Sequence, residues 1–138
     1  MRSRRFLPMA IGSLAAAAAG CGGSAGDLLA VQRSGNVPGA ELQVIITDGG
    51  LARCNEGDEL RLPEDLLLEA REIERDLEPA AEEELALEPG PGWVFRYDVE
   101  TPTGVVRFAD TSERRVAGMD ELAFLVRRVA QDVCELER

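Results

Sequence analysis

The chain has 138 residues and carries 26 acidic residues against 15 basic ones, a formal net charge of −11. Every basic residue is an arginine, so histidine general bases, histidine metal ligands and Schiff-base lysines are all excluded. An acidic chain repels nucleic acid, and its few aromatic residues do not interleave with a basic stripe, so we expect no nucleic-acid partner.

The first 20 residues have the three parts of an export signal. Three arginines precede an apolar stretch from Phe6 to Ala19, and small residues then lead to Cys21. The stretch is too short, and too interrupted by proline and glycine, for a membrane-spanning helix. The boundary resembles a bacterial lipobox, which implies that Met1–Gly20 is a lipoprotein signal peptide and that Cys21 is lipidated. Plain secretion is the alternative.

Residues 21–26 predict a lipidated cysteine followed by a flexible glycine- and serine-rich tether. Lipid on Cys21 would hold the protein at the extracytoplasmic face of the plasma membrane. Residues 3–7 also resemble a twin-arginine signal, so the export route is either general secretory or twin-arginine. Processing would remove three of the 15 arginines and no acid, leaving 12 basic against 26 acidic residues and a net charge of −14.

Cysteine usage suits an oxidising compartment. If Cys21 carries lipid, Cys54 and Cys134 are the pair that remains to form a disulfide. Closing about 80 residues would stabilise the fold by roughly 4 kcal/mol in the chain-entropy model. A structural zinc site is the alternative, but zinc normally takes four Cys or His ligands and only two thiols are left. We therefore expect no metal and no cofactor.

Residues 27–138 have the length of a single domain that can bury its own core. In the first half, period-two alternation between glycine-rich turns predicts strands and hairpins. The predicted strands are Leu28–Val31, Glu41–Thr47, Leu51–Cys54 and Glu59–Leu62, with turns at Asp48–Gly50 and Asn55–Asp58.

A helix is predicted next, with Pro63 in its first turn and acidic residues after it, where they suit the helix dipole. Its apolar positions extend to about Leu77, and Pro79 is expected to stop it. The acidic, proline-bounded stretch Glu78–Pro91 predicts a surface connection. The triple glutamate within it is typical of a solvated surface, although a cation or a basic partner could bind there.

A late hairpin is the clearest element of the second half. Trp93, Phe95, Tyr97 and Val99 alternate with more polar residues, and a turn at 101–104 leads into Val105–Ala109. The aromatic row could line a ligand groove, but one face of a strand is more often core.

The last predicted element is a helix that begins near Asp120, a plausible N-cap, and extends to Leu136 with apolar residues at helical spacing. Cys134 lies near its end, so a disulfide would tie this helix to Cys54. We therefore expect an α+β fold in which two hairpins form a small antiparallel sheet with two helices on one face.

Candidate chemistry is sparse. Acidic side chains around Asp48 and Asp58 could supply calcium ligands, but their spacing does not match an EF-hand loop. The serines have neither a nucleophile-elbow context nor a histidine partner. We expect that the protein is not an enzyme.

Three segments carry a family resemblance. They are Val31–Gly35 on the first strand, Phe95-x-Tyr97-x-Val99 and Asp110–Thr111 around the late hairpin. With the apolar C-terminal helix, the chain resembles emfourin-like inhibitors of thermolysin-type metalloproteases and a set of actinobacterial lipoproteins with the same Arg-Ser-Gly start. The resemblance implies partner contacts at Arg33, Ser34 and Gly35.

Two hypotheses follow. The first is a non-catalytic binding or scaffold lipoprotein with a protein partner, motivated by the anchor, the acidic surface and the missing catalytic groups. The second is an emfourin-like inhibitor, in which the rigid segment Arg33–Gly39 would sit in the protease cleft. A disulfide would suit that role, because a rigid segment loses little entropy on binding.

Overall fold

A computed structural model describes residues 26–137 of the protein. The expected signal peptide, Cys21 and the tether up to residue 25 lie outside the described residues. None of the described helices combines the length and the apolar character that crossing a bilayer requires.

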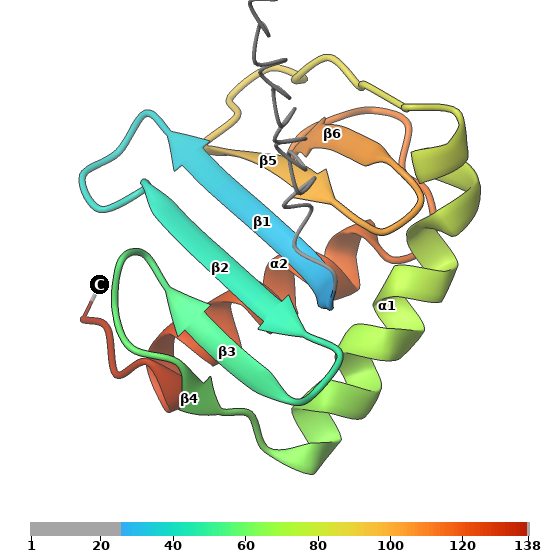
Figure 1. Ribbon diagram of the computed structural model, residues 1–138. Helices are drawn as coiled ribbons and strands as arrows, with labels where there is room; N and C mark the ends of the chain where they lie inside the picture. The colour runs from blue at the N-terminus through green and yellow to red at the C-terminus, as the bar shows by residue number, and fades with distance from the viewer. Residues whose placement is uncertain (1–25, 138) are drawn as a thin grey trace, which may run out of the picture.

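Six strands form one antiparallel sheet in the order β4-β3-β2-β1-β5-β6. The first strand, β1, lies near the centre and pairs with β2 on one side and with β5 on the other (Figure 1). The strand bounds are β1 Asp27–Gly35, β2 Leu42–Thr47, β3 Leu51–Cys54, β4 Leu60–Arg61, β5 Phe95–Glu100 and β6 Val105–Ala109. All the predicted strands are therefore present, and β1 is four residues longer at its C-terminal end than the expected Leu28–Val31.

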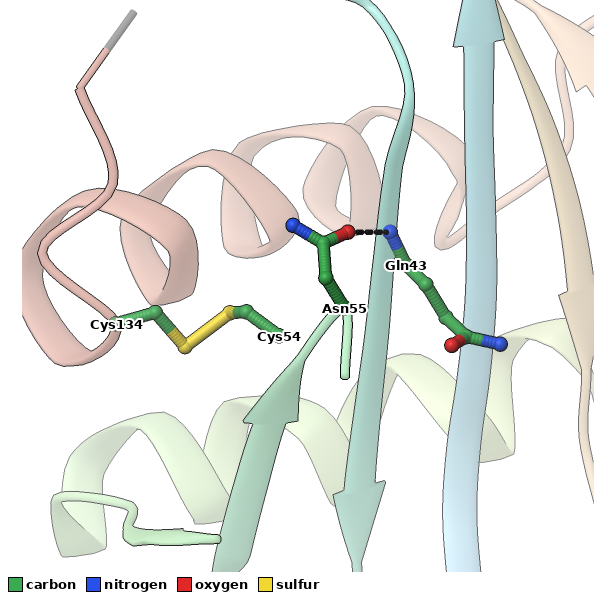
Figure 2. The surroundings of a disulfide bond; sticks show 4 residues. All are labelled: Gln43, Cys54, Asn55 and Cys134. Atoms are coloured by element: carbon green, nitrogen blue, oxygen red, sulfur yellow. Dashed lines mark hydrogen bonds between the residues drawn. A yellow bond between two sulfur atoms is a disulfide. The ribbon is translucent and has the colours of Figure 1, made fainter. Parts of the chain in front are cut away.

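The alternation seen in the sequence separates the two faces of the sheet. Leu29, Val31, Val44 and Val99 are buried on one face, whereas their neighbours along the strands, such as Gln32, point to the other face. Helices α1 (Glu64–Glu82) and α2 (Met119–Arg128) cover the apolar face, and a π-helical turn, η1 (Val129–Val133), continues α2. Figure 2 shows both helices on the same side of the strands. The predicted α+β class is confirmed.

Helix α1 continues past Pro79, so the prediction that this proline stops the helix was wrong. Pro79 lies in the last turn and its own side chain is exposed. Ala80 and Ala81, which follow it, extend the buried face that Leu66 and Leu77 form earlier in the helix. The burial of two more residues offsets the single backbone bond that the proline cannot donate.

The stretch Glu78–Pro91 is therefore not only a surface connection. Its first five residues belong to α1, and Ala86 forms a parallel bridge with Arg107 of β6. The Leu87 amide donates to the Arg107 carbonyl at 2.8 Å, and the Arg107 amide donates to the Leu85 carbonyl at 2.8 Å. This segment covers the outer edge of β6.

Helix α2 begins at Met119, and its N-cap is Gly118 rather than the predicted Asp120. Gly118 is buried with φ 91°, and a Cβ placed there would lie 3.0 Å from Cγ of Leu77. Only glycine adopts this conformation in so close a contact with α1. Leu136 was predicted on the buried face of the last helix, but it is 37% exposed. The helix ends before it, because Glu135 has φ 52° and reverses the chain.

Candidate binding cleft

A cleft of about 420 Å³ opens where the core layer between the sheet and α2–η1 reaches the surface. Its wall comes from the end of β1, the connection between β1 and β2, the start of β2 and of β5, the residue after β3, the end of α2, η1 and the residues after it. In Figure 1 the C-terminal segment lies on the side of the sheet where β1 ends and β2 begins. A second hollow on the open face of the sheet has only about 40 Å³. Of these two hollows, the cleft is the one with room for a ligand.

Arg33 is held rigidly in the wall of the cleft. Its Nε donates to the Ala40 carbonyl at 2.9 Å, and its Nη2 donates to the Gly39 carbonyl at 3.2 Å. The guanidinium carbon lies 4.7 Å from the centre of the Phe95 ring, which gives a cation–π contact. These contacts occupy two of the five N–H donors of the guanidinium, so the others remain for a ligand.

Arg127 reaches the cleft from the exposed face of α2. Its guanidinium carbon lies 5.2 Å from the centre of the Phe124 ring, and Phe124 itself is 49% exposed. The next residue, Arg128, instead forms ion pairs with Asp65 and Glu69 of α1. Among the described residues, no carboxylate lies within ion-pair distance of Arg33 or Arg127. Both guanidinium groups at the cleft therefore remain available to an outside acceptor.

Asn55 supplies a third donor at the other end of the cleft. Its backbone has φ 53°, a left-handed conformation that asparagine tolerates. Its side-chain Oδ1 accepts a hydrogen bond from the backbone amide of Gln43 at 3.0 Å, and its backbone amide donates to the backbone carbonyl of Gln43 at 2.8 Å. Figure 2 shows that this arrangement directs the side-chain NH₂ away from Gln43 and toward the helix. The donor is fixed in place by the backbone of β2.

The Cys54–Cys134 disulfide fixes the wall opposite the sheet, and the predicted pairing is confirmed. The two Cα atoms are 6.2 Å apart, across 80 residues of chain (Figure 2). Beyond the helix, the Cys134 amide donates to the Val129 carbonyl and the Leu136 amide donates to the Ala130 carbonyl, each at 2.9 Å. These wide turns place Leu136 on the cleft, and π-helical turns of this kind are frequent at functional sites.

The remaining wall mixes apolar and acidic groups. Leu42, Phe95 and Leu136 provide apolar surface, and Glu41 and Glu137 provide carboxylates. Charges of both signs, an amide and apolar side chains thus surround one cavity. Such a lining can bind and orient a ligand of mixed character.

The structure separates the three residues expected to contact a partner. Arg33 lines the cleft, whereas Ser34, its neighbour on the strand, points to the open face of the sheet. Gly35 has a packing role, because a Cβ on it would lie 2.3 Å from the Val94 carbonyl oxygen. The three residues therefore do not form one surface.

Sequence reasoning did not find Asn55, Arg127 or Leu136 as residues of the cleft. Asn55 was assigned to a turn and Leu136 to the core, and only the predicted disulfide pointed to the nearness of their two segments. The aromatic residues of the late hairpin were predicted either to line a ligand groove or to lie in the core, and the structure has one of each. Tyr97 is 5% exposed and stacks on Phe108 in the core, while Phe95 is half-buried at the cleft.

Tyr97 is a titratable group buried in the core. Burial raises the pKa of its hydroxyl, while the positive charges of Arg33, then of Arg115 and least of Arg127, lower it. Asp110 nearby raises the pKa further. The two guanidinium groups of the cleft thus act on the same buried hydroxyl.

Within residues 26–137, no group of three or more side chains that could hold a metal ion gathers at one place. The groups that line the cleft are suited to recognition: fixed N–H donors, carboxylate acceptors and apolar surface. No family model, curated protein or solved structure matches the chain.

Proposed function

We propose that the protein is a lipid-anchored, extracytoplasmic binding module without catalytic activity, and that it takes a protein partner at the cleft. The observation that carries this proposal is the composition of the cleft. Arg33 and Arg127 lie beside apolar and aromatic side chains, and Arg33 is held by a hydrogen bond to the Ala40 carbonyl and by the Phe95 ring. Arginine and aromatic residues dominate the binding energy of protein interfaces, and rigid side chains lose little entropy on binding.

The position of the cleft supports the same proposal. A tether from Cys21 would join β1 at Asp27, and the cleft lies at the other end of this strand, beyond Arg33. Nine residues of extended strand span roughly 25 to 30 Å. A protein anchored through Cys21 would therefore hold the cleft away from its point of attachment, where a partner can reach it.

Two experiments test the two parts of the proposal. Labelling with a radioactive fatty acid should mark the wild-type protein and fail to mark the Cys21→Ser variant. Labelling of both proteins, or of neither, would contradict the lipid anchor.

The partner is tested by crosslinking. A photo-crosslinking residue at Leu136 should capture one defined protein in living cells, whereas the same residue at exposed Gln32 on the open face should not. Equal capture at both positions would overturn the assignment of the cleft.

A second candidate function is inhibition of a thermolysin-type metalloprotease, and the bracing of the segment Arg33–Gly39 favours it. The Asn36 side chain donates to the Trp93 carbonyl at 2.8 Å, and the Asn36 amide donates to the Val94 carbonyl at 3.2 Å. Between these bonds and those of Arg33, Val37 is 40% exposed. A short exposed segment fixed at both ends is suited to entering a protease cleft without a large loss of entropy.

This candidate is tested by titrating the chain from residue 21 onward, with Cys21→Ser, against a thermolysin-type metalloprotease. Stoichiometric inhibition that weakens after reduction of Cys54–Cys134 is the expected result for an inhibitor. Full protease activity in excess protein would remove this candidate. Inhibition that survives Arg33→Ala and Val37→Ala would place the inhibitory surface elsewhere.

A further inference from the structure

The donors at the cleft converge on one kind of ligand group. Arg33, Asn55 and Arg127 come from three different elements, and each is held by contacts other than an acidic side chain. Guanidinium and amide N–H groups arranged in this way suit a carboxylate, which accepts several charge-assisted hydrogen bonds. We infer that the cleft recognises a short peptide segment through a carboxylate held between Arg33 and Arg127. This inference rests on the proposed function and names the chemistry of its partner.

The rest of the wall explains why the ligand is a peptide rather than a small free anion. The whole chain is strongly negative, so it does not concentrate small anions from solution. Leu42, Phe95 and Leu136 instead offer apolar surface to a neighbouring side chain of the ligand. Glu41 and Glu137 are acceptors for backbone N–H groups or for a positive charge. The cavity of about 420 Å³ lies within the range of sites that enclose small ligands.

Arg127 is the best residue with which to test this inference. Arg127 is exposed on α2, and within residues 26–137 its side chain donates no hydrogen bond to a backbone carbonyl, whereas Arg33 also fixes the loop before β2. Arg127→Gln therefore removes a ligand contact and leaves the fold intact. Arg75→Gln is a matched control, because Arg75 is an exposed helical arginine on α1 and does not line the cleft.

The experiment is a nuclear magnetic resonance titration of the ¹⁵N-labelled chain from residue 21 onward, with Cys21→Ser. The probes are three degenerate pools of acetylated tetrapeptides. The first has a free C-terminal carboxylate and no acidic side chain, the second has a C-terminal amide and no acidic side chain, and the third has a C-terminal amide and one glutamate. The Nε–H signal of Arg127 reports contact with the carboxylate directly, and that of Arg33, whose Nε is bonded to the Ala40 carbonyl, reports the change of charge at its guanidinium group.

The expected result is a shift of both signals with a pool that carries a carboxylate and none with the second pool. A response to the first pool alone assigns a C-terminal carboxylate, and a response to the third pool alone assigns an acidic side chain. Arg127→Gln should weaken binding about tenfold, as expected for the loss of one charge-assisted bond, and Arg75→Gln should not.

Three results would overturn the inference. Equal shifts with all pools would mean that the cleft binds peptides without recognising a carboxylate, which contradicts the inference and leaves the proposed function standing. Unchanged affinity for the peptide pools in Arg127→Gln would show that the carboxylate does not lie between Arg33 and Arg127. No shift with any pool at millimolar concentration would reject peptide carboxylates as ligands, while the crosslinking experiment decides independently whether a protein partner occupies the cleft.

Discussion

The two helices cover the same face of the sheet but are held in different ways. Along α1, buried apolar residues recur from Leu66 to Ala81, so apolar packing closes this half of the core. At the far end of α2 the packing weakens, since Val133 is only half-buried and Leu136 is exposed. There the disulfide at Cys134 holds the chain in place of apolar contacts. A cleft persists where a cross-link rather than close packing holds two layers together.

Leu77→Ala should have the largest effect, because it attacks the packed half. Leu77 is fully buried on α1 and lies against Gly118 at the start of α2. We expect a loss of about 3 to 5 kcal/mol in the free energy of unfolding, measured by urea denaturation. Leu68→Ala on the same helix is the control, because Leu68 is 57% exposed and should cost less than about 0.5 kcal/mol. Similar losses in both variants would contradict the assigned face of α1.

The double variant Cys54→Ala/Cys134→Ala attacks the cross-linked half. Its free energy of unfolding should fall by about 2 to 4 kcal/mol. The loss should be local as well as global, because the amides of Cys134 and Leu136 depend on wide turns next to the disulfide. Hydrogen exchange should therefore accelerate at these amides more than in α1. Uniform acceleration along both helices would refute the difference between the two halves.

Substitutions at Arg33 and Ser34 compare neighbours on opposite faces of β1. Arg33→Ala removes the bonds to the Gly39 and Ala40 carbonyls and should cost about 1 kcal/mol, given that the side chain is partly exposed. Ser34→Ala should change stability by less than about 0.5 kcal/mol. Exchange of the Ala40 amide should rise in the first variant only. A larger effect at Ser34 would show that the open face contributes more than the cleft.

Arg128→Gln tests the ionic link between the helices. Arg128 bonds to Glu69 at 3.0 Å and to Asp65 at 3.3 Å, and the Asp65 side chain is 70% exposed. We expect a loss of only about 0.5 to 1 kcal/mol, and less in high salt, because solvent and ions screen the pair. Arg127→Gln, one residue earlier, should leave stability unchanged. The loss is measured by denaturation at low and at high salt. An equal loss at both salt concentrations would contradict a screened ionic contribution of Arg128.

Tyr97→Phe should have no measurable effect on stability near neutral pH and a clear one in alkali. Burial raises the pKa of Tyr97 above its ordinary value of 10.0, so the folded state holds the phenolic proton more tightly than the unfolded chain does. Its contribution to stability is complete below pH 10 and is lost as the pH rises through the folded-state pKa. Tyr97→Phe should reduce this alkaline loss.

Tyr97 is the single tyrosine of the chain, so its ultraviolet absorbance reports the titration directly. The native protein should ionise at a higher pH than the urea-unfolded chain. Ionisation at the same pH in both states would contradict the burial of the hydroxyl.

Local patterns were enough to predict most of the elements. Alternation and glycine turns placed the strands from Leu42 to Cys54, and elimination among the cysteines gave the disulfide. Strands depend on the pattern of neighbouring residues, and the disulfide was inferred from the number of cysteines and the expected oxidising compartment. Both kinds of information can be read from a single sequence. The errors at Pro79 and at Gly118 arose where tertiary contacts outweighed local preference. Neither the burial of Ala80 and Ala81 nor the contact between Gly118 and α1 is visible in local spacing.

The cleft was beyond sequence reasoning for a different reason. It joins residues from β1, from the turn after β3 and from the end of α2, so its existence depends on strand order. That order places β5 beside β1 rather than beside β4, which no local pattern specifies. Arg33 was singled out through a family resemblance, but Arg127 looked like one of several exposed arginines. Only the folded chain brings the two together.

The covered edge of β6 would have a consequence for crowding if the protein is anchored to a membrane as proposed. Open sheet edges can pair with one another and start aggregation, and a lipid anchor would raise the local concentration of the protein. Here the segment around Ala86 occupies one edge, and the other edge is β4, which has only two residues, one of them the charged Arg61. The described sheet therefore offers neighbouring molecules no long strand to extend, and dense arrays of a protein anchored in this way would stay free of edge-to-edge polymers.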